Sequence, residues 1–272
     1  MSSAIELRPT YWACVSGGKD SFYMLYLILQ HLDEYPLDGV VHYQLEIDYP
    51  FIKDVIDLIE DQCRQLHIPV FRIQPRKSWI EHYNTEIKSG KWKGSKKLYP
   101  TRLARWCNSH YKLDCARQLE EMMKAQGKRV INYIGFCYDE PKRFKYDLHD
   151  RENNVTQIYP LAEMGVYEED ILEWAKQQPI YNGFYLENRR CGCMGCPMSS
   201  MNDFVYLKEH YPEQFDYFMG LAKETEEIRG AMLGRQFSVW GPPKYDTDYK
   251  IKRVNEIIEL KDYKRKKNGE AA

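Results

Sequence analysis

Short apolar runs alternate with segments of helical periodicity from residue 11 to residue 135. The apolar runs at residues 11–15, 39–45, 69–73 and 129–135 have the length of buried strands. Between them, apolar positions recur at helical spacing from residue 22 onward, over 51–67 and over 111–125. This alternation predicts an α/β fold, a doubly wound, mostly parallel sheet covered by helices on both faces. Ligands of such sheets bind beyond the carboxyl ends of the strands.

The pattern changes near Pro179, where the composition shifts. We therefore expect an α/β domain over residues 1–178 and a helical, cysteine-bearing region over residues 179–272. In the second region, residues 203–227 have a helical pattern, the chain reverses at residues 240–243, and residues 251–260 form a final helix.

The stretch Ser16-Gly17-Gly18-Lys19-Asp20-Ser21 stands where the first expected strand passes into the first expected helix. Two glycines let the backbone turn sharply and approach a ligand closely, so that N–H groups and the positive end of the helix dipole point at an anion. Ser16 and Ser21 add hydroxyl donors, and Lys19 adds a positive charge. The spacing fits neither a Walker A loop nor GxGxxG. It predicts a phosphate-binding loop, with a simple turn and helix cap as the alternative.

Charge and composition limit the possible partners. The chain has 272 residues, 43% of them hydrophobic, and a formal net charge of −1, which gives no overall attraction to nucleic acid or membrane. Any contact with a polyanion must come from local clusters. Lysines surround Trp92 in an expected mobile loop at residues 88–97, and residues 264–267 form a basic tail. Both clusters fit either nucleic-acid contacts or solvated surface.

No segment has membrane or export character. The longest wholly apolar run, residues 22–29, is far too short to span a bilayer, and the first nine residues lack a signal-peptide core. We expect a cytoplasmic protein without a membrane partner. We therefore do not expect the eight cysteines to form a disulfide framework, because their spacing is uneven and no export signal accompanies them.

Three cysteines fall within the segment Arg189-Arg190-Cys191-Gly192-Cys193-Met194-Gly195-Cys196-Pro197. Thiols separated by glycines can converge on one soft metal centre, and the glycines let backbone N–H groups turn toward sulfur, as in iron–sulfur turns. The two arginines are expected to favour the thiolate forms. Structural zinc is the alternative, whereas a disulfide across so short a loop would be strained. Four other cysteines are expected to be small buried side chains: Cys14, Cys63, Cys115 and Cys137.

Taken together, these motifs resemble the PP-loop ATP pyrophosphatase group. Within that group the chain resembles the phosphoadenylylsulfate (PAPS) reductase-like family, which includes proteins that install phosphorothioates in DNA. The segment Ser16 to Ser21 matches the PP-loop, and Ile47-Asp48-Tyr49-Pro50 is a looser counterpart of the family's Thr-Gly-x-x-x-Pro. Arg105-Trp106-Cys107, followed by Lys112, resembles the family's Arg-Trp-Cys and downstream lysine.

Two further segments carry the resemblance. Residues 134–143, Ile-Gly-Phe-Cys-Tyr-Asp-Glu-Pro-Lys-Arg, are similar to the family's Gly-Ile-Arg-x-Asp-Glu-Ser-x-Arg-Arg, although Cys137 and Tyr138 replace family residues. Pro179-Ile180-Tyr181-Asn182-Gly183-Phe184 resembles the lead-in to the family's Gly-Cys-x-x-Cys-Pro. We expect residues 135–143 and the phosphate loop to share one rim of the sheet.

The resemblance implies an ATP site with Mg²⁺. Cations offset the roughly four negative charges of ATP, and Asp20 or Asp139 helps to hold the metal ion. The implied catalytic residues are Lys19, Asp20, Asp139 and Arg143. The implied nucleotide-binding residues are Ser16, Gly17, Gly18, Lys19, Asp20, Ser21, Arg105, Lys112, Gly135 and Glu140.

The resemblance also implies a fourth cysteine for the metal centre. Cys107 would join Cys191, Cys193 and Cys196 around a 4Fe–4S cluster, with zinc as the alternative. In a second arrangement Cys191 stays outside, and three cysteines leave one iron open to carry sulfur.

The implied activity is an ATP-dependent sulfurtransferase that adenylates an oxygen-bearing acceptor, releases pyrophosphate and inserts sulfur from a donor such as a cysteine desulfurase. DNA, tRNA and a small molecule all remain open as acceptors, as does the oligomeric state. One alternative is a PAPS reductase-like enzyme, against which no cysteine follows Cys196. Another is a non-catalytic nucleotide-binding component of a nucleic-acid modification complex.

Overall fold

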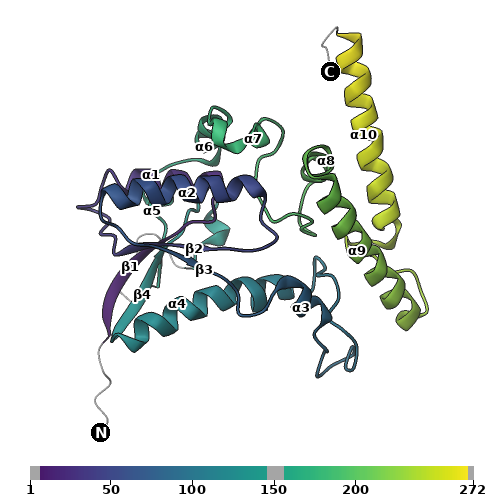
Figure 1. The fold of residues 1–272 in the computed structure, drawn as a ribbon, viewed down its shortest axis with the longest axis horizontal. Coiled ribbons are helices and arrows are strands. Elements are labelled where there is room, and N and C mark those ends of the chain that lie inside the picture. The colour runs from purple at the N-terminus through teal and green to yellow at the C-terminus, as the bar shows by residue number, and fades with distance from the viewer. Residues whose placement is uncertain (1–6, 146–155, 269–272) are drawn as a thin grey trace. The chain divides into compact units, whose positions relative to one another are not determined.

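The computed structural model describes residues 7–145 and 156–268, so most of the first nine residues lie outside it (Figure 1). By internal contacts the chain divides into two units. Residues 1–76 and 112–191 form the first, here called the sheet unit. Residues 77–111 and 192–272 form the second, here called the cysteine unit. This division differs from a single boundary near Pro179, because residues 77–111 group with the C-terminal residues.

The sheet unit contains a five-stranded parallel sheet, which confirms the predicted fold class. Its strands are β1 (Arg8–Cys14), β2 (Gly39–Tyr43), β3 (Val70–Ile73), β4 (Lys128–Tyr133) and β5 (Gln157–Ile158). They lie in the order β3-β2-β1-β4-β5. The strand order therefore reverses at β1: β2 and β3 follow on one side of it, and β4 and β5 on the other. In open α/β sheets this reversal marks the crevice where ligands bind.

Helices cover both faces of this sheet, as predicted. α1 (Lys19–Ile28) and α2 (Pro50–Gln65) lie on one face, and α4 (Leu113–Ala125) lies on the other (Figure 1). α2 begins at a proline, which is tolerated there because the first helical N–H groups have no intrahelical partner. Its apolar positions recur at helical spacing and are buried: Phe51, Ile52, Val55, Ile56 and Ile59.

Short helices complete the sheet unit. They are α5 (Pro160–Glu163), α6 (Glu168–Lys176) and α7 (Phe184–Glu187), with 3₁₀ turns at Pro141–Arg143 and Pro179–Tyr181. The ring of Trp174 on α6 packs edge-on against Phe22 and Tyr23 of α1, at centroid distances of 5.6 and 5.1 Å. A π-helical turn, Cys107–Lys112, leads into α4, where the sequence predicted regular helix from residue 111. Periodicity alone does not distinguish a π-turn from an α-helix.

The cysteine unit is helical, as expected of the C-terminal region. Its helices are α3 (Trp79–Asn84), α8 (Met201–His210), α9 (Pro212–Leu233) and α10 (Thr247–Lys267). A 3₁₀ turn at Pro243–Tyr245 precedes α10. The single helix predicted over residues 203–227 is two helices, because Pro212 cannot donate a backbone hydrogen bond to the preceding turn. Ser200 and Asp203 form a capping box that starts α8.

Aromatic rings form much of the core of this unit. The indole of Trp79 lies 5.4–5.9 Å from the rings of Tyr83, Tyr99, Trp106 and Phe218. The lysine-rich segment 88–97 is attached to α9 by Arg229, whose guanidinium stacks on Trp92 at 4.2 Å and donates to the hydroxyl of Ser95 at 2.9 Å. The segment predicted to be a mobile loop is thus held to α9 by Arg229. The Arg229 guanidinium already covers one face of Trp92.

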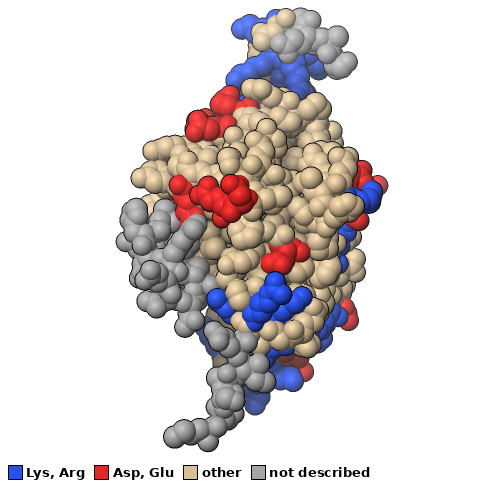
Figure 2. All heavy atoms as spheres, turned by 90° about the vertical axis from the view of Figure 1, so that its left-hand side faces the viewer, with Lys and Arg blue, Asp and Glu red and all other residues tan. Residues whose placement is uncertain are grey.

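Charge is spread without a dominant sign. Figure 2 shows a face on which basic and acidic side chains form small separate groups on an otherwise uncharged surface. Within residues 7–145 and 156–268, no helix is long and apolar enough to cross a membrane.

Candidate functional site

The loop between β1 and α1 has the tight backbone that the two glycines predict. Gly17 has a φ of +76°, and a Cβ there would lie 2.8 Å from Cγ2 of Ile52, so glycine is required on both grounds. The Ser21 hydroxyl accepts from the Ser16 N–H at 3.1 Å and donates to the Gly18 carbonyl at 3.0 Å. The two serines therefore hold the loop in shape, rather than only supplying donors to a ligand.

Lys19 starts α1 and is buried, with 1% of its side chain exposed. Its Nζ lies 2.5 Å from Oδ1 of Asp20 and 3.6 Å from Oε1 of Glu168 on α6. Its backbone N–H donates to the hydroxyl of Tyr185 at 2.9 Å. Burial raises the pKa of Asp20 despite the attraction of Lys19, and Glu140 and Glu168 raise it further. A buried cation thus lies beside the carboxylates of Asp20 and Glu168 at the N-terminus of α1.

Gly135 brings the end of β4 against this helix N-terminus. A Cβ at Gly135 would lie 3.0 Å from the backbone C and O of Asp20 and from the N of Ser21. Because backbone yields less easily than a flexible side chain, glycine favours this close approach. The phosphate loop and the segment after β4 therefore meet at the reversal of strand order, as expected.

The acidic and basic residues after Gly135 have partners within the sheet unit. Glu140 accepts from Arg143 at 2.8 Å and from Arg190 at 2.9 Å. Arg190 also reaches Glu168 at 3.2 Å. The carboxylate of Asp139 accepts from the backbone N–H of Glu168 at 3.2 Å, so it caps the start of α6.

The two arginines before the cysteines are balanced by acids. Arg190 pairs with Glu140 and Glu168, and Arg189 lies 2.7 Å from Glu169. The positive charge expected to favour thiolates is therefore neutralised by carboxylates.

Two tyrosines and Cys191 border the loop. A Cβ at Gly18 would lie 3.6 Å from the Tyr185 hydroxyl and 3.8 Å from Cβ of Cys191. Burial, and then Cys191, raises the pKa of both Tyr181 and Tyr185. The Tyr181 hydroxyl is buried and has no hydrogen-bond partner in the described part of the chain. Burying a hydroxyl without a hydrogen-bond partner costs free energy of folding, unless a ligand or a water molecule supplies the missing hydrogen bond.

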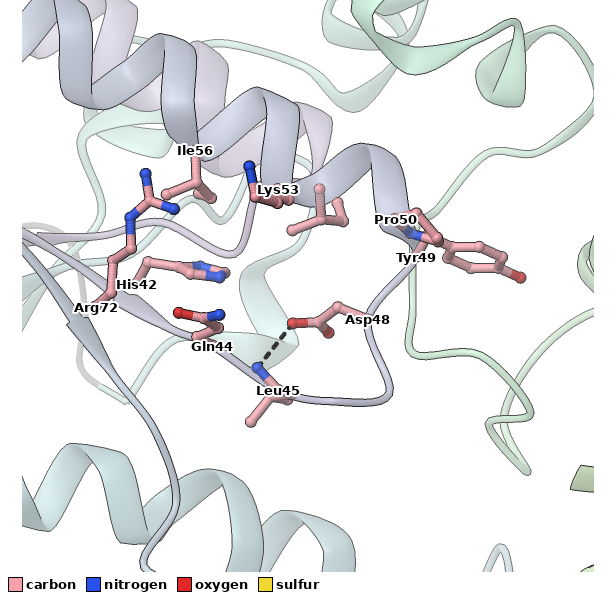
Figure 3. Close-up of a pocket in the computed structure, with 10 residues that line it drawn as sticks. His42, Gln44, Leu45, Asp48, Tyr49, Pro50, Lys53, Ile56 and Arg72 are labelled. Atoms are coloured by element: carbon pink, nitrogen blue, oxygen red, sulfur yellow. Dashed lines mark hydrogen bonds between the residues drawn. The ribbon is translucent and has the colours of Figure 1, made fainter. Parts of the chain in front are cut away.

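A pocket of about 130 Å³ opens beside the loop, at the carboxyl end of β2 (Figure 3). Its polar lining includes His42, Gln44, Lys53 and Arg72, and Ile52 belongs both to this lining and to the contact with Gly17.

Asp48 closes one side of this pocket and accepts from the Leu45 N–H at 3.1 Å (Figure 3). Burial raises the pKa of Asp48 to about 6, and the charge of Lys112 opposes the rise. Two motif residues far apart in sequence, Asp48 and Lys112, thus interact within the sheet unit. Arg105 belongs to the cysteine unit, and its carbonyl accepts from the Asn108 N–H at 3.0 Å.

The cysteine turn of the second unit is closely packed. The Cys196 N–H donates to the Cys193 carbonyl at 3.2 Å, and the Met198 N–H donates to the Cys196 sulfur at 3.4 Å. Gly195 has a φ of +64°, and a Cβ there would lie 2.5 Å from Cγ of Phe218. The Tyr99 hydroxyl donates to the Gly195 carbonyl.

Three cysteines act electrostatically on that tyrosine. The pKa of Tyr99 is raised well above its usual range, first by burial and then by Cys196, Cys107 and Cys193. Across the described ranges, no three His, Cys, Asp or Glu side chains are already arranged about one metal position. Cys191 falls in the sheet unit. Of the cysteines expected to be buried, Cys63, Cys115 and Cys137 are buried and Cys14 is partly exposed.

Sequence reasoning missed several residues of the site in the sheet unit. Glu168 and Tyr185 contact Lys19 and were assigned no role, and Arg190 contacts Glu140 although it was expected only to favour the thiolate forms of the cysteines. Tyr181 lay in a recognised segment, also without an assigned role. Their positions depend on how α6 and α7 pack on α1, which local patterns do not encode.

Comparisons with known proteins give limited likenesses. No protein-family model matches the chain. An uncharacterized protein of Methanocaldococcus jannaschii is 26% identical over 260 residues, which cover 92% of this chain and 55% of that protein. The chain therefore spans about half the length of that curated relative.

Among solved structures, the U34-tRNA thiolase NcsA from Methanococcus maripaludis with its 4Fe–4S cluster is similar over 78% of this chain and 70% of that one. The TM-score is 0.36 and the sequence identity 16%. The function proposed for this chain rests on its own residues.

Proposed function

We propose that this chain is an ATP-dependent sulfurtransferase of the PP-loop ATP pyrophosphatase group. It adenylates an oxygen-bearing acceptor, releases pyrophosphate, and exchanges the activated oxygen for sulfur. The observation that carries the proposal is the loop between β1 and α1. It lies at the reversal of strand order, and an added Cβ would crowd the Ile52 side chain at Gly17 and the backbone of Asp20 and Ser21 at Gly135.

Lys19 and its carboxylates suggest how the triphosphate is received. In the free protein, the Lys19 ammonium is held by Asp20 and Glu168. ATP brings Mg²⁺, which prefers carboxylate and phosphate oxygens. Asp20 would hold the metal ion, and Lys19, released from Asp20, would turn to the phosphates. This exchange keeps every buried charge paired, which a low-dielectric site requires.

The adenine end of ATP reaches the pocket beside the loop, whose volume of about 130 Å³ takes only part of the nucleoside. That pocket adjoins Gly17 through Ile52 and offers the polar groups of His42 and Gln44. The unpaired hydroxyl of Tyr181, electrostatically coupled to Asp20, is a donor available to the phosphates or the acceptor.

The reaction then proceeds in two displacements. An acceptor oxygen attacks the α-phosphorus, the bond to the bridging α–β oxygen breaks, and pyrophosphate leaves with that electron pair. A sulfur nucleophile next attacks the acceptor atom that bears the adenylated oxygen, and AMP leaves. The protein's contribution is to hold and neutralise the phosphates, since such transfers depend on positioning and electrostatics.

The cysteine unit supplies the sulfur centre in this proposal. Three thiols coupled to one hydroxyl, with an N–H donor on the Cys196 sulfur, fit the donor set of an iron–sulfur turn. Cys107, Cys193 and Cys196 would hold a 4Fe–4S cluster, which would bind sulfide from a donor such as a cysteine desulfurase. Three ligands suit this arrangement better than structural zinc, which takes four.

The products of nucleotide turnover test the proposal. With ATP labelled at the α-phosphate, Mg²⁺, sulfide and total tRNA or DNA as the acceptor, we expect AMP and pyrophosphate from the wild-type chain and none from Gly135→Ala. Gly220→Ala serves as the control, because Gly220 has no positive φ and an added Cβ there meets nothing within 4 Å. ADP and orthophosphate as products, or tighter binding of PAPS than of ATP, would refute it.

A further inference from the structure

We propose that the cysteine unit carries a binding site for single-stranded nucleic acid. An unstacked base enters the pocket beside Phe237, and neighbouring phosphates lie on Arg102 and Arg235. The inference rests on the proposed function for the strand's role as acceptor, whereas binding of the strand can be measured without ATP.

Residues 77–111 concentrate positive charge. They hold eight lysines and arginines against two acidic residues, in a chain whose net charge is −1. Among the described residues, none of these eight cations forms an ion pair. One of the two acids, Glu81, is engaged in the capping box of α3. Burial and the charge of Lys77 lower the pKa of Lys97, as expected where like charges are close. Unpaired cations of this density attract a polyanion.

A tight turn projects two side chains from this segment. The Ala104 N–H donates to the Thr101 hydroxyl at 2.9 Å, and the Thr101 N–H donates to the Ala104 carbonyl at 3.2 Å. Arg102 and Leu103 occupy the tip, and Leu103 is 100% exposed. A fully exposed leucine beside an unpaired arginine has no role in the core of this unit.

That turn forms one wall of a pocket of about 250 Å³. The opposite wall is the chain from Arg235 to Pro243. Leu103 and Phe237 give apolar surface, and Arg102 and Arg235 add two cations. Drug-sized ligands take pockets of roughly 300–1,000 Å³, so this one suits a single planar ring system.

The second wall is held rigidly. Glu226 accepts from the Val239 N–H at 3.0 Å and from the Thr247 N–H at 2.9 Å. The Ser238 hydroxyl donates to the Tyr245 carbonyl at 3.0 Å, and the Trp240 indole donates to the Thr247 hydroxyl at 3.0 Å. The pocket is therefore formed before any ligand arrives, which lowers the entropic cost of binding.

The chemistry of the pocket selects a single strand. An acidic peptide would satisfy the arginines but leave the apolar walls without a matching surface. A base linked to phosphates satisfies both, because bases stack on apolar and aromatic side chains while cations follow the backbone. In a duplex the bases are already stacked and paired, so they cannot enter.

Binding of a fluorescent 12-nucleotide RNA of mixed sequence, followed by anisotropy, tests the inference. We expect Arg102→Gln/Arg235→Gln to weaken binding by at least tenfold. The slope of log K against log salt concentration should become less negative by about 1.4. Each phosphate contact on a single strand contributes about 0.7 to this slope, and the variant removes two. Leu103→Ala should weaken binding several-fold without changing the melting temperature. Arg64→Gln/Arg117→Gln, which removes two ion-paired cations of the sheet unit, should bind as the wild type does.

Further arms identify the ligand. Binding of single-stranded DNA of the same sequence shows whether the site accepts deoxyribose as well as ribose. Binding of either single strand supports the site. Equal binding of the RNA duplex, competition by AMP at the same nucleotide concentration, or unchanged binding by the double arginine variant would overturn the inference. Strand binding without pyrophosphate formation would contradict the proposed function and leave this site standing. Pyrophosphate formation without strand binding would support the proposed function and overturn this site.

Discussion

The candidate site of the sheet unit and residues 77–111 of the cysteine unit treat positive charge in opposite ways. In the sheet unit, Lys19, Arg143 and Arg190 are each paired with a carboxylate. In the cysteine unit, the eight cations of residues 77–111 have no acidic partner among the described residues. The first arrangement suits a site that receives a compact anion together with its metal ion, because partners can be exchanged. The second suits a long polyanion, which supplies the missing charge itself.

The largest expected effect tests the phosphate loop. Gly17→Ala puts a methyl group 2.8 Å from Ile52 at a φ of +76°, so the loop must move. We expect ATP binding, measured by calorimetry with Mg²⁺, to fall at least a hundredfold.

Gly127→Ala is the matched control for that change. Gly127 has a φ of +71°, and a Cβ added there meets nothing within 4 Å, so it carries the strain without the collision. ATP binding by this control should stay near the wild-type value. Equal losses in the two variants would show that strain, and not the shape of the loop, sets the affinity.

The cysteine turn gives the next largest effect. Gly195→Ala combines a positive φ with a contact of 2.5 Å to Phe218, and should lower the free energy of unfolding by about 4 kcal/mol. Gly234→Ala, at a φ of +63° with no neighbour within 4 Å, should cost only about 1 kcal/mol. Urea denaturation measures both. Similar values would mean that the turn is not packed as described.

Asp48 provides a pH-dependent effect in the sheet unit. Its folded pKa of about 6 exceeds the usual 3.8, so between these values the folded state binds more protons than the unfolded state. Stability is therefore lost as pH rises from about 4 to 6. Asp48→Asn should raise the free energy of unfolding by up to about 3 kcal/mol at pH 7 and by almost nothing at pH 3.5. A gain independent of pH would contradict this origin.

The smallest effect compares single surface cations. Arg64→Gln removes ion pairs of α2 with Asp61 and Glu60 and should cost at most about 0.5 kcal/mol, and less at high salt. Lys93→Gln removes an unpaired cation from the basic segment and should be neutral or slightly stabilising. Thermal melts at two salt concentrations measure both changes in stability. A larger loss of stability for Lys93→Gln than for Arg64→Gln would contradict the difference in charge pairing described above.

The fold was predictable where local pattern decides it. Apolar runs and helical spacing gave four of the five strands and the helices that cover them, and the glycines of residues 16–18 located the turn between β1 and α1. The break before α9 was also readable in principle, because Pro212 cannot continue a helix.

What escaped prediction depends on distant packing. β5 has only two residues, too few for a pattern. Glu168 and Tyr185 reach Lys19 across about 150 residues of sequence. The grouping of residues 77–111 with the C-terminal residues rests on contacts such as the hydrogen bond of Tyr83 to Glu224 at 2.9 Å, which no spacing announces.

Metal and sulfide content after anaerobic purification tests the central claim most directly, namely that one chain joins a nucleotide site to a sulfur centre. We expect about four iron and four sulfide per chain with no zinc. Cys107→Ala should lose this content, and Cys115→Ala, a buried cysteine of the sheet unit, should keep it. One zinc per chain without iron, or iron retained by Cys107→Ala, would contradict the account.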